Sequence, residues 1–308
     1  MGNDAWSVPS LEALATSGHD LRLVMTRVPR PAGRGNRLTP TPVADAARRL
    51  GLPLEEVETV KSGVGFEALR RTAPDVIAVV AYGEIVPARV LEVPKMGSVN
   101  LHFSLLPELR GAAPVQRALL EGLTVTGVTT ILMDEGMDTG PVLEQAEERI
   151  AEDDDAGSLG GRLAVLGARL LVDTVDRLAA DALEPRPQDE EKATYAPKLR
   201  PEERWLDWTE EAPLVVRRVR ALAPDPAASA LFRGDTLKVF RAEADEPAGS
   251  PGEITDVSKE GFRVGAGRGS VRPLEVAPSG RKRMTAAEFV RGFRPRAGER
   301  LEAPRGSA

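Results

Sequence analysis

The residues best suited to chemistry lie in the segment 98–116, which reads SVNLHFSLLPELRGAAPVQ. Asn100 and His102 are two positions apart on an expected strand, so their side chains point to the same face. They lie at its carboxyl end, where open α/β sheets place their binding sites. An amide can donate a hydrogen bond to a developing oxyanion, and an imidazole can move a proton or share in that stabilisation. The pair therefore favours acyl transfer.

A second polar segment, residues 133–143, reads MDEGMDTGPVL and follows a later expected strand. Asp138 lies there in a turn bracketed by glycines. A carboxylate next to an imidazole fixes the tautomer of the ring and supports its charged form. Taken singly, each residue also has a plain structural interpretation. Asp138 reads as a turn aspartate, Asn100 as a turn or cap residue, and His102 as a hydrogen-bonded, half-buried histidine.

Composition excludes several other kinds of site. The chain of 308 residues has no cysteine and only two histidines, His19 and His102. Disulfides, thiolate nucleophiles, zinc–thiolate sites and a His-rich metal centre are therefore excluded, and we expect no metal. No apolar run approaches the roughly 18–20 residues that span a bilayer. No basic segment followed by an apolar one opens the chain, so we expect a cytoplasmic protein without a membrane partner.

The elements that must position these side chains alternate along the first half of the chain. Four short apolar runs predict strands, at 21–26, 75–82, 98–102 and 127–133. Five amphipathic stretches predict helices, at 9–17, 42–50, 66–72, 114–121 and 158–178. The run 76–80 is apolar throughout, which is typical of a parallel strand covered by helices on both faces. We expect a doubly wound, mostly parallel, Rossmann-like α/β domain over residues 1–180.

The chain changes character after residue 180. Residues 181–204 are rich in Pro, Glu, Asp and Lys without periodicity, which predicts a linker. An expected helix at 213–222 is followed by four short strand-like runs, at 237–241, 252–257, 261–264 and 270–276. Short strands at close spacing favour a small, OB-like β-barrel over residues 205–308.

Charge is unevenly distributed between these two parts. Residues 1–205 hold 23 basic and 32 acidic residues, a net −9, and residues 206–308 hold 18 and 15, a net +3. The segment 262–308 alone holds 11 basic and 4 acidic residues, a net +7. A basic region is the electrostatic footprint of a polyanion such as nucleic acid. A solvated, Arg-rich surface is the plainer alternative.

The amino terminus is short for this architecture. A βαβ unit needs a strand before its first helix, but only residues 1–7 precede the helix expected at 9–17. In a doubly wound sheet that strand is normally central, and each buried backbone group left unpaired would destabilise the fold by about 1–3 kcal/mol. We therefore expect the natural start roughly ten residues upstream of Met1, with an apolar, β-branched run between.

The two polar segments together resemble the methionyl-tRNA formyltransferase family, and the likeness covers nearly the whole chain. The combination N-x-H-x-S-L-L-P, R-G-A-A-P-x-Q and M-D-x-G-x-D-T-G is highly specific. The resemblance implies a catalytic trio of Asn100, His102 and Asp138. It also implies folate contacts at Ser104, Leu105, Leu106, Pro107, Tyr82 and Gly83. Two departures stand out: GNDAWS replaces the family's G-T-P-x-F-A-like turn, and Pro224–Asp225–Pro226 replaces its P-W-P segment.

The acceptor is indicated by other features. Residues 30–42 read RPAGRGNRLTPTP, which predicts a Gly- and Pro-punctuated loop with three arginines, Arg30, Arg34 and Arg37. Arginines on a loop suit phosphate contact, although a solvated loop is the plainer alternative. The stretch resembles the loop that the family inserts into the acceptor end of initiator tRNA. A basic cluster in the second domain, Arg281, Lys282 and Arg283, is expected to join this contact.

The resemblance implies one-carbon transfer from 10-formyltetrahydrofolate to the α-amino group of methionine on initiator methionyl-tRNA, for translation initiation. We expect the enzyme to be a monomer. Two alternatives stay open. Other folate-dependent formyltransferases share the trio and act on amino-sugar or nucleotide acceptors, although glycinamide ribonucleotide formyltransferases resemble only the first domain. A catalytically idle RNA-binding relative is the second alternative.

Overall fold

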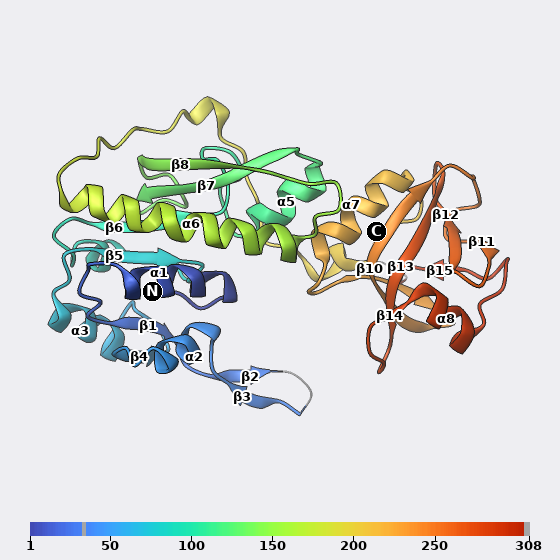
Figure 1. Ribbon diagram of the computed structural model, residues 1–308, viewed down its shortest axis with the longest axis horizontal. Helices are drawn as coiled ribbons and strands as arrows, with labels where there is room; N and C mark the ends of the chain where they lie inside the picture. The colour runs from blue at the N-terminus through green and yellow to red at the C-terminus, as the bar shows by residue number, and fades with distance from the viewer. Residues whose placement is uncertain (33–34, 305–308) are drawn as a thin grey trace. The chain divides into compact units, whose positions relative to one another are not determined.

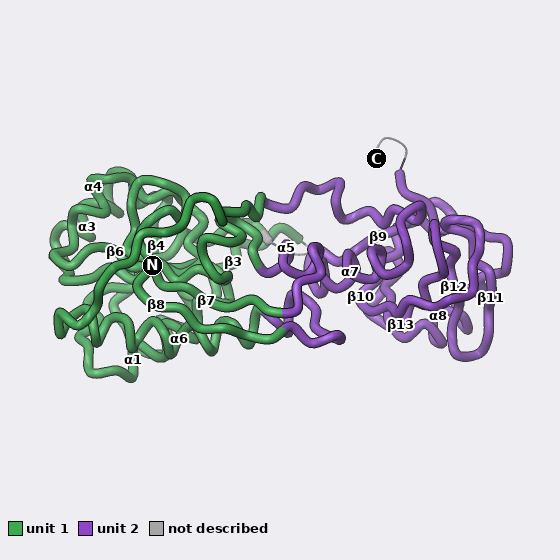
Figure 2. Tube along the Cα trace, turned by 90° about the horizontal axis from the view of Figure 1, so that it is seen from above, with its two compact units in different colours: residues 1–114, 125–149, 160–197 green, residues 115–124, 150–159, 198–308 purple. Residues whose placement is uncertain are grey.

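The computed structural model describes residues 1–32 and 35–304, and Figure 1 shows its helices and strands. The chain divides into two compact units, which Figure 2 colours separately. Unit 1 consists of residues 1–114, 125–149 and 160–197, and unit 2 of residues 115–124, 150–159 and those from 198 on. Neither unit is a single stretch of chain. The domain boundaries expected above, at 180 and 204, stay a prediction.

Unit 1 contains a sheet in two parts. Strand β1 (Val24–Arg27) pairs in parallel with β4 (Leu54–Val57). The other part has four strands in the order β5 (Ile77–Val80), β6 (Ser98–His102), β7 (Val125–Leu132) and β8 (Val142–Arg149). β5 and β6 are parallel, whereas β7 and β8 are each antiparallel to the strand before them. The expected Rossmann-like domain is confirmed. β8 adds an antiparallel edge strand that the sequence did not predict, because most of its residues are charged or polar.

Six α-helices occur in the described chain up to residue 179: α1 (Val8–Thr16), α2 (Pro42–Arg49), α3 (Gly63–Thr72), α4 (Ala88–Leu91), α5 (Pro114–Glu121) and the long α6 (Ala156–Ala179) (Figure 1). Nearly all of α5 and the first residues of α6 belong to unit 2. Thr41 caps α2, because its side chain accepts a hydrogen bond from the Ala44 amide at 3.0 Å. α6 packs against the sheet, since a Cβ added to Gly167 would lie 2.7 Å from the Leu101 side chain on β6. A glycine is thus required for this close approach.

Met1 and Gly2 lie between the two parts of the sheet. The Val80 amide donates to the Met1 carbonyl at 2.9 Å, and the Gly2 amide donates to the Met25 carbonyl at 3.2 Å. These two residues connect the β1 part of the sheet to the β5 part. Beside them is a cavity of about 480 Å³, whose lining includes residues 21–25 of the β1 side and 75–78 of the β5 side.

The described part of the segment 30–42 forms two short paired strands, whereas its glycines and prolines predicted a loop. Strand β2 (Arg30–Ala32) pairs antiparallel with β3 (Arg37–Thr39). Gly35 and Asn36 precede β3 with φ values of +94° and +52°, which are left-handed conformations favoured in tight turns. The Gly-Asn pair was a hairpin signal that the nearby prolines obscured.

Unit 2 contains helix α7 (Ala212–Leu222) and an antiparallel sheet. Its strands are β9 (Ala228–Phe232), β10 (Asp235–Asp245), β11 (Ile254–Val257), β12 (Phe262–Gly265), β13 (Ser270–Pro278), β14 (Met284–Thr285) and β15 (Leu301–Glu302). They pair in the order β11-β12-β13-β10-β9-β15, with β14 beside β13. A bridge between Glu253 and Arg300 joins the two ends of this order. The curled sheet confirms the expected small barrel, and closure protects its edges.

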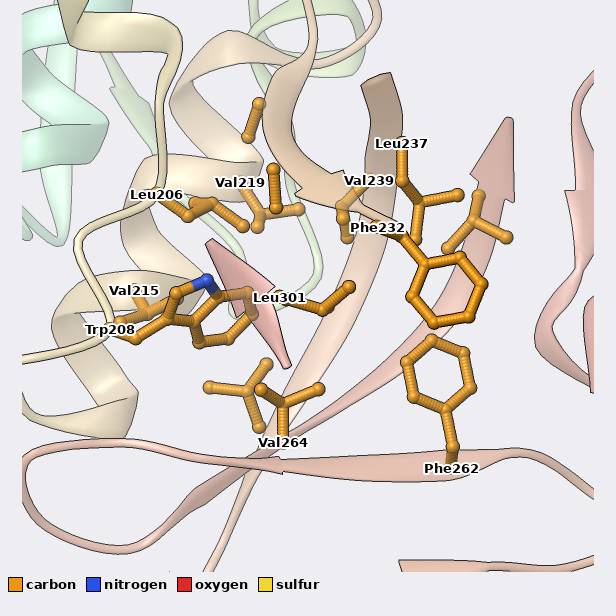
Figure 3. Close-up of a cluster of buried hydrophobic side chains, with 14 of the residues drawn as sticks. Leu206, Trp208, Val215, Val219, Phe232, Leu237, Val239, Phe262, Val264 and Leu301 are labelled. Carbon is orange, nitrogen blue, oxygen red and sulfur yellow. The ribbon is translucent and has the colours of Figure 1, made fainter. Parts of the chain in front are cut away.

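The core of unit 2 explains why this sheet curls. Alternate residues of the strands point inward, so that Phe232, Leu237, Val239, Phe262 and Val264 meet inside, together with Trp208, as Figure 3 shows. Helix α8 (Ala286–Phe293) adds Phe289, whose ring centre lies 5.4 Å from that of Phe262. Three short 3₁₀ turns complete the described chain: Ala5–Ser7, Glu190–Lys192 and Pro201–Arg204. Among the described residues, no helix is long and apolar enough to cross a membrane.

Candidate active site

Strand β6 carries the two side chains from which the site is built. It lies between β5 and β7, and Asn100 is in register with Val79 on one side and Ile131 on the other. His102 is the last residue of β6, and its side chain is only 6% exposed. The near-continuous apolarity of the neighbouring strands buries β6. A polar pair at its carboxyl end is therefore held rigidly on one face.

The turn between β7 and β8 brings Asp138 to this pair. Asn100 Nδ2 donates to Asp138 Oδ1 at 3.3 Å, and His102 Nδ1 lies 3.6 Å from Asp138 Oδ2. The Gly111 amide donates to the same Oδ2 atom at 2.9 Å. The structure thus gathers three predicted side chains from segments far apart in sequence into one small polar cluster.

The tautomer of His102 is set by main chain rather than by Asp138. The Nε2 atom lies 2.9 Å from the Leu109 carbonyl oxygen, which can only accept a hydrogen bond. Nε2 must therefore carry a hydrogen, and Nδ1 is the ring atom on the Asp138 side. Sequence reasoning assigned the orientation of the ring to the carboxylate alone. It had no signal for Leu109, because a carbonyl group belongs to every residue type.

The loop 104–107 follows β6 directly and is fixed beside the cluster. The Thr129 hydroxyl donates to the Ser104 carbonyl at 2.7 Å and accepts from the Leu106 amide at 3.1 Å. Gln145 Nε2 donates to the Leu106 carbonyl at 2.8 Å. Ser104 and Leu106 are buried, whereas Leu105 and Pro107 are half-buried. Thr129 and Gln145, on β7 and β8, support the loop, and sequence reasoning missed both of them.

Tyr82 and Gly83, the other expected folate contacts, follow β5 and differ in accessibility. The Tyr82 side chain belongs to a buried cluster with Met25 and Val86, and it is 4% exposed. Burial, and next the charge of Glu84, raise the pKa of the Tyr82 hydroxyl above its usual value. Gly83 is exposed, and a Cβ added to it would meet nothing within 4 Å. Main chain at Gly83, rather than the Tyr82 ring, is therefore open to a ligand here.

The expected tRNA contacts lie on exposed turns of both units. Arg30 and Arg37 are exposed on β2 and β3, and Arg34 lies outside the described residues. Arg281 and Lys282 are exposed between β13 and β14. Arg283 is already engaged, because it pairs with Glu275 and its guanidinium lies 4.7 Å from the centre of the Phe240 ring.

A group of polar residues that sequence reasoning missed lies next to the cluster. Arg110 is almost fully buried, and Gln188 and Glu190 bind its guanidinium. The only sequence signal was Arg110 itself, the first residue of the R-G-A-A-P motif. Within residues 1–32 and 35–304, no group of three or more His, Asp or Glu side chains is arranged to hold a metal ion.

Comparison with known proteins follows the division of the chain. Residues 1–175 match the formyl transferase family, and residues 198–294 match the formyl transferase C-terminal domain family. The chain is 42% identical over 301 residues to a methionyl-tRNA formyltransferase of Geobacter sulfurreducens, covering 98% of this chain and 95% of that one. It is 45% identical over 303 residues to that of Halorhodospira halophila, covering 98% and 97%.

Solved structures show the same fold at much lower identity. An N-formyltransferase from Helicobacter canadensis, in complex with folinic acid and dTDP-3-aminofucose, has a TM-score of 0.65 at 17% identity. It covers 88% of this chain and 96% of its own. HypX from Aquifex aeolicus, in complex with tetrahydrofolic acid, has a TM-score of 0.62 at 20% identity and covers 83% and 45%. Given the family matches and the identity over nearly the full length, this chain belongs to the methionyl-tRNA formyltransferase family.

Proposed function

We propose that this protein transfers the formyl group of 10-formyltetrahydrofolate to the α-amino group of methionine on initiator methionyl-tRNA. The observation that carries the proposal is the cluster of Asn100, His102 and Asp138 beside the loop 104–107. An amide, an imidazole and a carboxylate at one point can serve attack by an amine on a formyl carbon. In this reading the loop 104–107, with Tyr82 and Gly83, contacts the folate.

Each member of the trio has a role that its contacts allow. The amine nitrogen attacks the formyl carbon, and a tetrahedral oxyanion forms. Asn100 Nδ2 uses one hydrogen for Asp138, so its second hydrogen is available to the oxyanion. His102 shares in that stabilisation when Nδ1 also carries a hydrogen, because Nε2 already donates its own hydrogen to the Leu109 carbonyl. Asp138 takes part in removing the amine proton, the carbon–N10 bond breaks, and N10 of tetrahydrofolate gains a proton.

The acceptor is supported by the hairpin β2–β3 and by the charge of the second half of the chain. Exposed Arg30 and Arg37 suit phosphate contact, and Arg34 lies between them in sequence. The net +7 of residues 262–308, with Arg281 and Lys282 exposed, suits a polyanion. The relatives from Geobacter sulfurreducens and Halorhodospira halophila, at 42% and 45% identity, both carry the name methionyl-tRNA formyltransferase, which supports the same acceptor. We further propose that the protein acts as a monomer in the cytoplasm.

A formylation assay with three acceptors tests this function. The purified chain is incubated with 10-formyltetrahydrofolate and either methionyl initiator tRNA, uncharged initiator tRNA or a dTDP-amino sugar. We expect formylmethionyl-tRNA as the only product. Formylation of the sugar alone would assign the chain to the other acceptor class. Binding of tRNA without any transfer would identify the idle RNA-binding alternative.

A further inference from the structure

A segment after α6 returns to the candidate active site and is tied to it at both ends. We call residues 186–196 the strap. At its start, Arg186 and Val142 exchange two main-chain hydrogen bonds of 2.8 Å each. Near its end, the Arg110 amide donates to the Thr194 carbonyl at 2.9 Å, and the Ala196 amide donates to the Arg110 carbonyl at 2.7 Å. The strap therefore contacts the chain just after the Asp138 turn and just after the loop 104–107.

Gln188 of the strap holds the Asp138 turn directly. Its Nε2 atom donates to the Asp138 carbonyl at 2.8 Å and to the Gly140 carbonyl at 2.7 Å. Asp138 has a φ of +56°, a left-handed conformation that is uncommon for non-glycine residues, although Asp adopts it more readily than most. Two hydrogen bonds from one amide group thus brace the main chain that aims the Asp138 carboxylate at His102.

Arg110 fixes which way the Gln188 amide faces. Its Nε and Nη2 atoms donate to Gln188 Oε1 at 3.0 and 2.8 Å. A guanidinium can only donate, so the Gln188 oxygen must face Arg110 and the Gln188 nitrogen must face the turn. The remaining side of the guanidinium forms two bonds of 2.8 Å with the Glu190 carboxylate. These bonds to Glu190 raise the pKa of Arg110, which therefore stays a cation.

The main chain on either side of Arg110 reaches the other members of the cluster. The Leu109 carbonyl accepts from His102 Nε2, and the Gly111 amide donates to the Asp138 carboxylate. The Leu109 amide in turn donates to the Thr194 hydroxyl of the strap at 2.8 Å. One short segment, 109–111, thus contacts His102, Asp138 and the strap.

We propose that Arg110 and Gln188 are positioning residues that couple the turn carrying Asp138 to the segment that orients His102. This inference rests on the proposed function. The Arg110 side chain is fully buried although it is charged, whereas the side chain of its partner Glu190 is 68% exposed, so burial of the guanidinium has a desolvation cost. Arg110 instead determines orientation. Two of its donors hold the Gln188 amide oxygen, so the Gln188 amide nitrogen faces the Asp138 and Gly140 carbonyl groups.

Two substitutions at position 188 separate this role from simple packing. Gln188→Met keeps the length of the side chain and removes every hydrogen bond. Gln188→Glu keeps an acceptor for Arg110 but can no longer donate to the Asp138 and Gly140 carbonyls. We expect both to lower kcat for formyl transfer by about ten- to a hundredfold, since a misplaced reacting group has effects of this size. The KM for the folate donor should change less than about twofold, because the loop 104–107 has its own supports.

Glu191→Gln is the matched control in the same strap. Glu191 is exposed, and its main-chain amide donates to Asp189, whereas its side chain forms no hydrogen bond or ion pair within residues 1–32 and 35–304. We expect the kinetics of this variant to match those of the unsubstituted chain. Equal kcat values in Gln188→Met, Gln188→Glu and the control would overturn the inference, as would a loss confined to the KM for folate.

A spectroscopic readout is independent of activity. The chain has only two histidines, so ring ¹⁵N spectra contain two imidazoles, and a His19→Gln variant assigns them. We expect both Gln188 variants to shift the His102 ring signals, with those of His19 and of Glu191→Gln unchanged. Unshifted His102 signals would overturn the coupling. A chain without formyl transfer whose His102 signals respond to Gln188 would sink the proposed function and leave the coupling supported.

Discussion

At the scale of single residues, the candidate active site depends on which atoms are left free by neighbouring contacts. Leu109 occupies His102 Nε2, and Asp138 occupies one hydrogen of the Asn100 amide. The 3.6 Å between His102 Nδ1 and Asp138 Oδ2 exceeds a normal hydrogen bond, so a reacting group can still engage either atom. An oxyanion needs hydrogen-bond donors, so Asn100 offers it Nδ2–H, and His102 offers it Nδ1–H once the ring carries a second hydrogen.

Removal of either oxyanion donor should abolish most of the formyl transfer. We expect His102→Ala and Asn100→Ala to lower kcat by about 100- to 1,000-fold, the usual effect of losing one such donor. Binding of tRNA, measured by filter retention, should persist because neither residue lies on the hairpin or in the basic cluster. His19→Ala is the control for loss of an imidazole elsewhere. More than about a tenth of the original turnover in His102→Ala would contradict its assigned role.

The arginines of the hairpin should act on tRNA alone. We expect Arg37→Ala to raise the KM for methionyl-tRNA and to leave the KM for folate unchanged. Loss of one phosphate contact should also reduce the salt dependence of tRNA binding by about one unit of slope. Arg70→Ala, an exposed arginine on α3, serves as the control. An equal loss of folate affinity in Arg37→Ala would show that the hairpin belongs to the folate site.

At the scale of elements, the two parts of the unit 1 sheet are joined through Met1 and Gly2, beside a cavity of about 480 Å³. The amino group of Met1 is inside the protein, where it donates to the Ala78 carbonyl at 2.6 Å. Burial lowers the pKa of this amino group from 8.0 to about 5. A buried amine reduces the stability of this part of the sheet.

The stability of a chain that begins at Met1 should therefore rise with pH between 5 and 8. In that interval the unfolded chain binds a proton on its terminus that the folded chain does not, so raising the pH favours folding. The full effect corresponds to about 4 kcal/mol, reached as the pH falls to 5. Thermal unfolding measured from pH 5 to pH 8 checks this expectation. The comparison is a variant in which added residues move the terminal amino group away from the Ala78 carbonyl.

The comparison variant carries about six Val- and Ile-rich residues ahead of Met1, the length of an ordinary strand. We expect it to melt at a higher temperature because it fills the cavity, with its largest advantage at pH 5. A Gly- and Ser-rich extension of equal length controls for the added residues, since it offers little apolar surface to bury. The gain in melting temperature of the Val- and Ile-rich form over the chain that begins at Met1 should vary with pH. If that gain were the same at pH 5 and pH 8, the Met1 amino group would not be buried as the structure has it.

At the scale of the whole molecule, the parts of the chain before and after residue 205 differ in net charge. The net charge is −9 up to residue 205 and +3 after it. Much of the positive charge is already paired, as Arg233 is with Glu299 and Arg263 with Asp245. Exposed Arg281 and Lys282 form no ion pair or hydrogen bond through their side chains among the described residues. These two are the best candidates in unit 2 for contact with a phosphate backbone.

The double variant Arg281→Ala/Lys282→Ala should weaken tRNA binding and leave binding of the folate donor unchanged. We expect the affinity to fall for tRNA of any sequence, and the slope of affinity against salt to decrease by about two. Titration of full-length protein with tRNA at several salt concentrations measures both. Lys259→Ala, another exposed basic residue of unit 2, is the control. An unchanged slope in the double variant would remove this turn from the tRNA contact.

Much of the local structure followed from short-range patterns. The strand 98–102 and the helix 114–121 have the bounds that were predicted, because apolar runs and helical periodicity act within a few residues. The alternation of side chains along β6 also placed Asn100 and His102 on one face before any fold was known. The hairpin of residues 30–39 was missed, since its prolines and glycines outweighed a strand signal only three residues long.

The sequence by itself indicated the candidate reacting side chains, most of the elements around them and the family to which the chain belongs. Only the tertiary structure decided how those side chains are held. The Leu109 carbonyl accepts a hydrogen bond from His102. The Gln188 side chain, 50 positions away in sequence, donates to the Asp138 main-chain carbonyl. Carbonyl groups are common to all residues, so no pattern of residue types can indicate which of them will be used. That choice is made only when packing brings distant segments together.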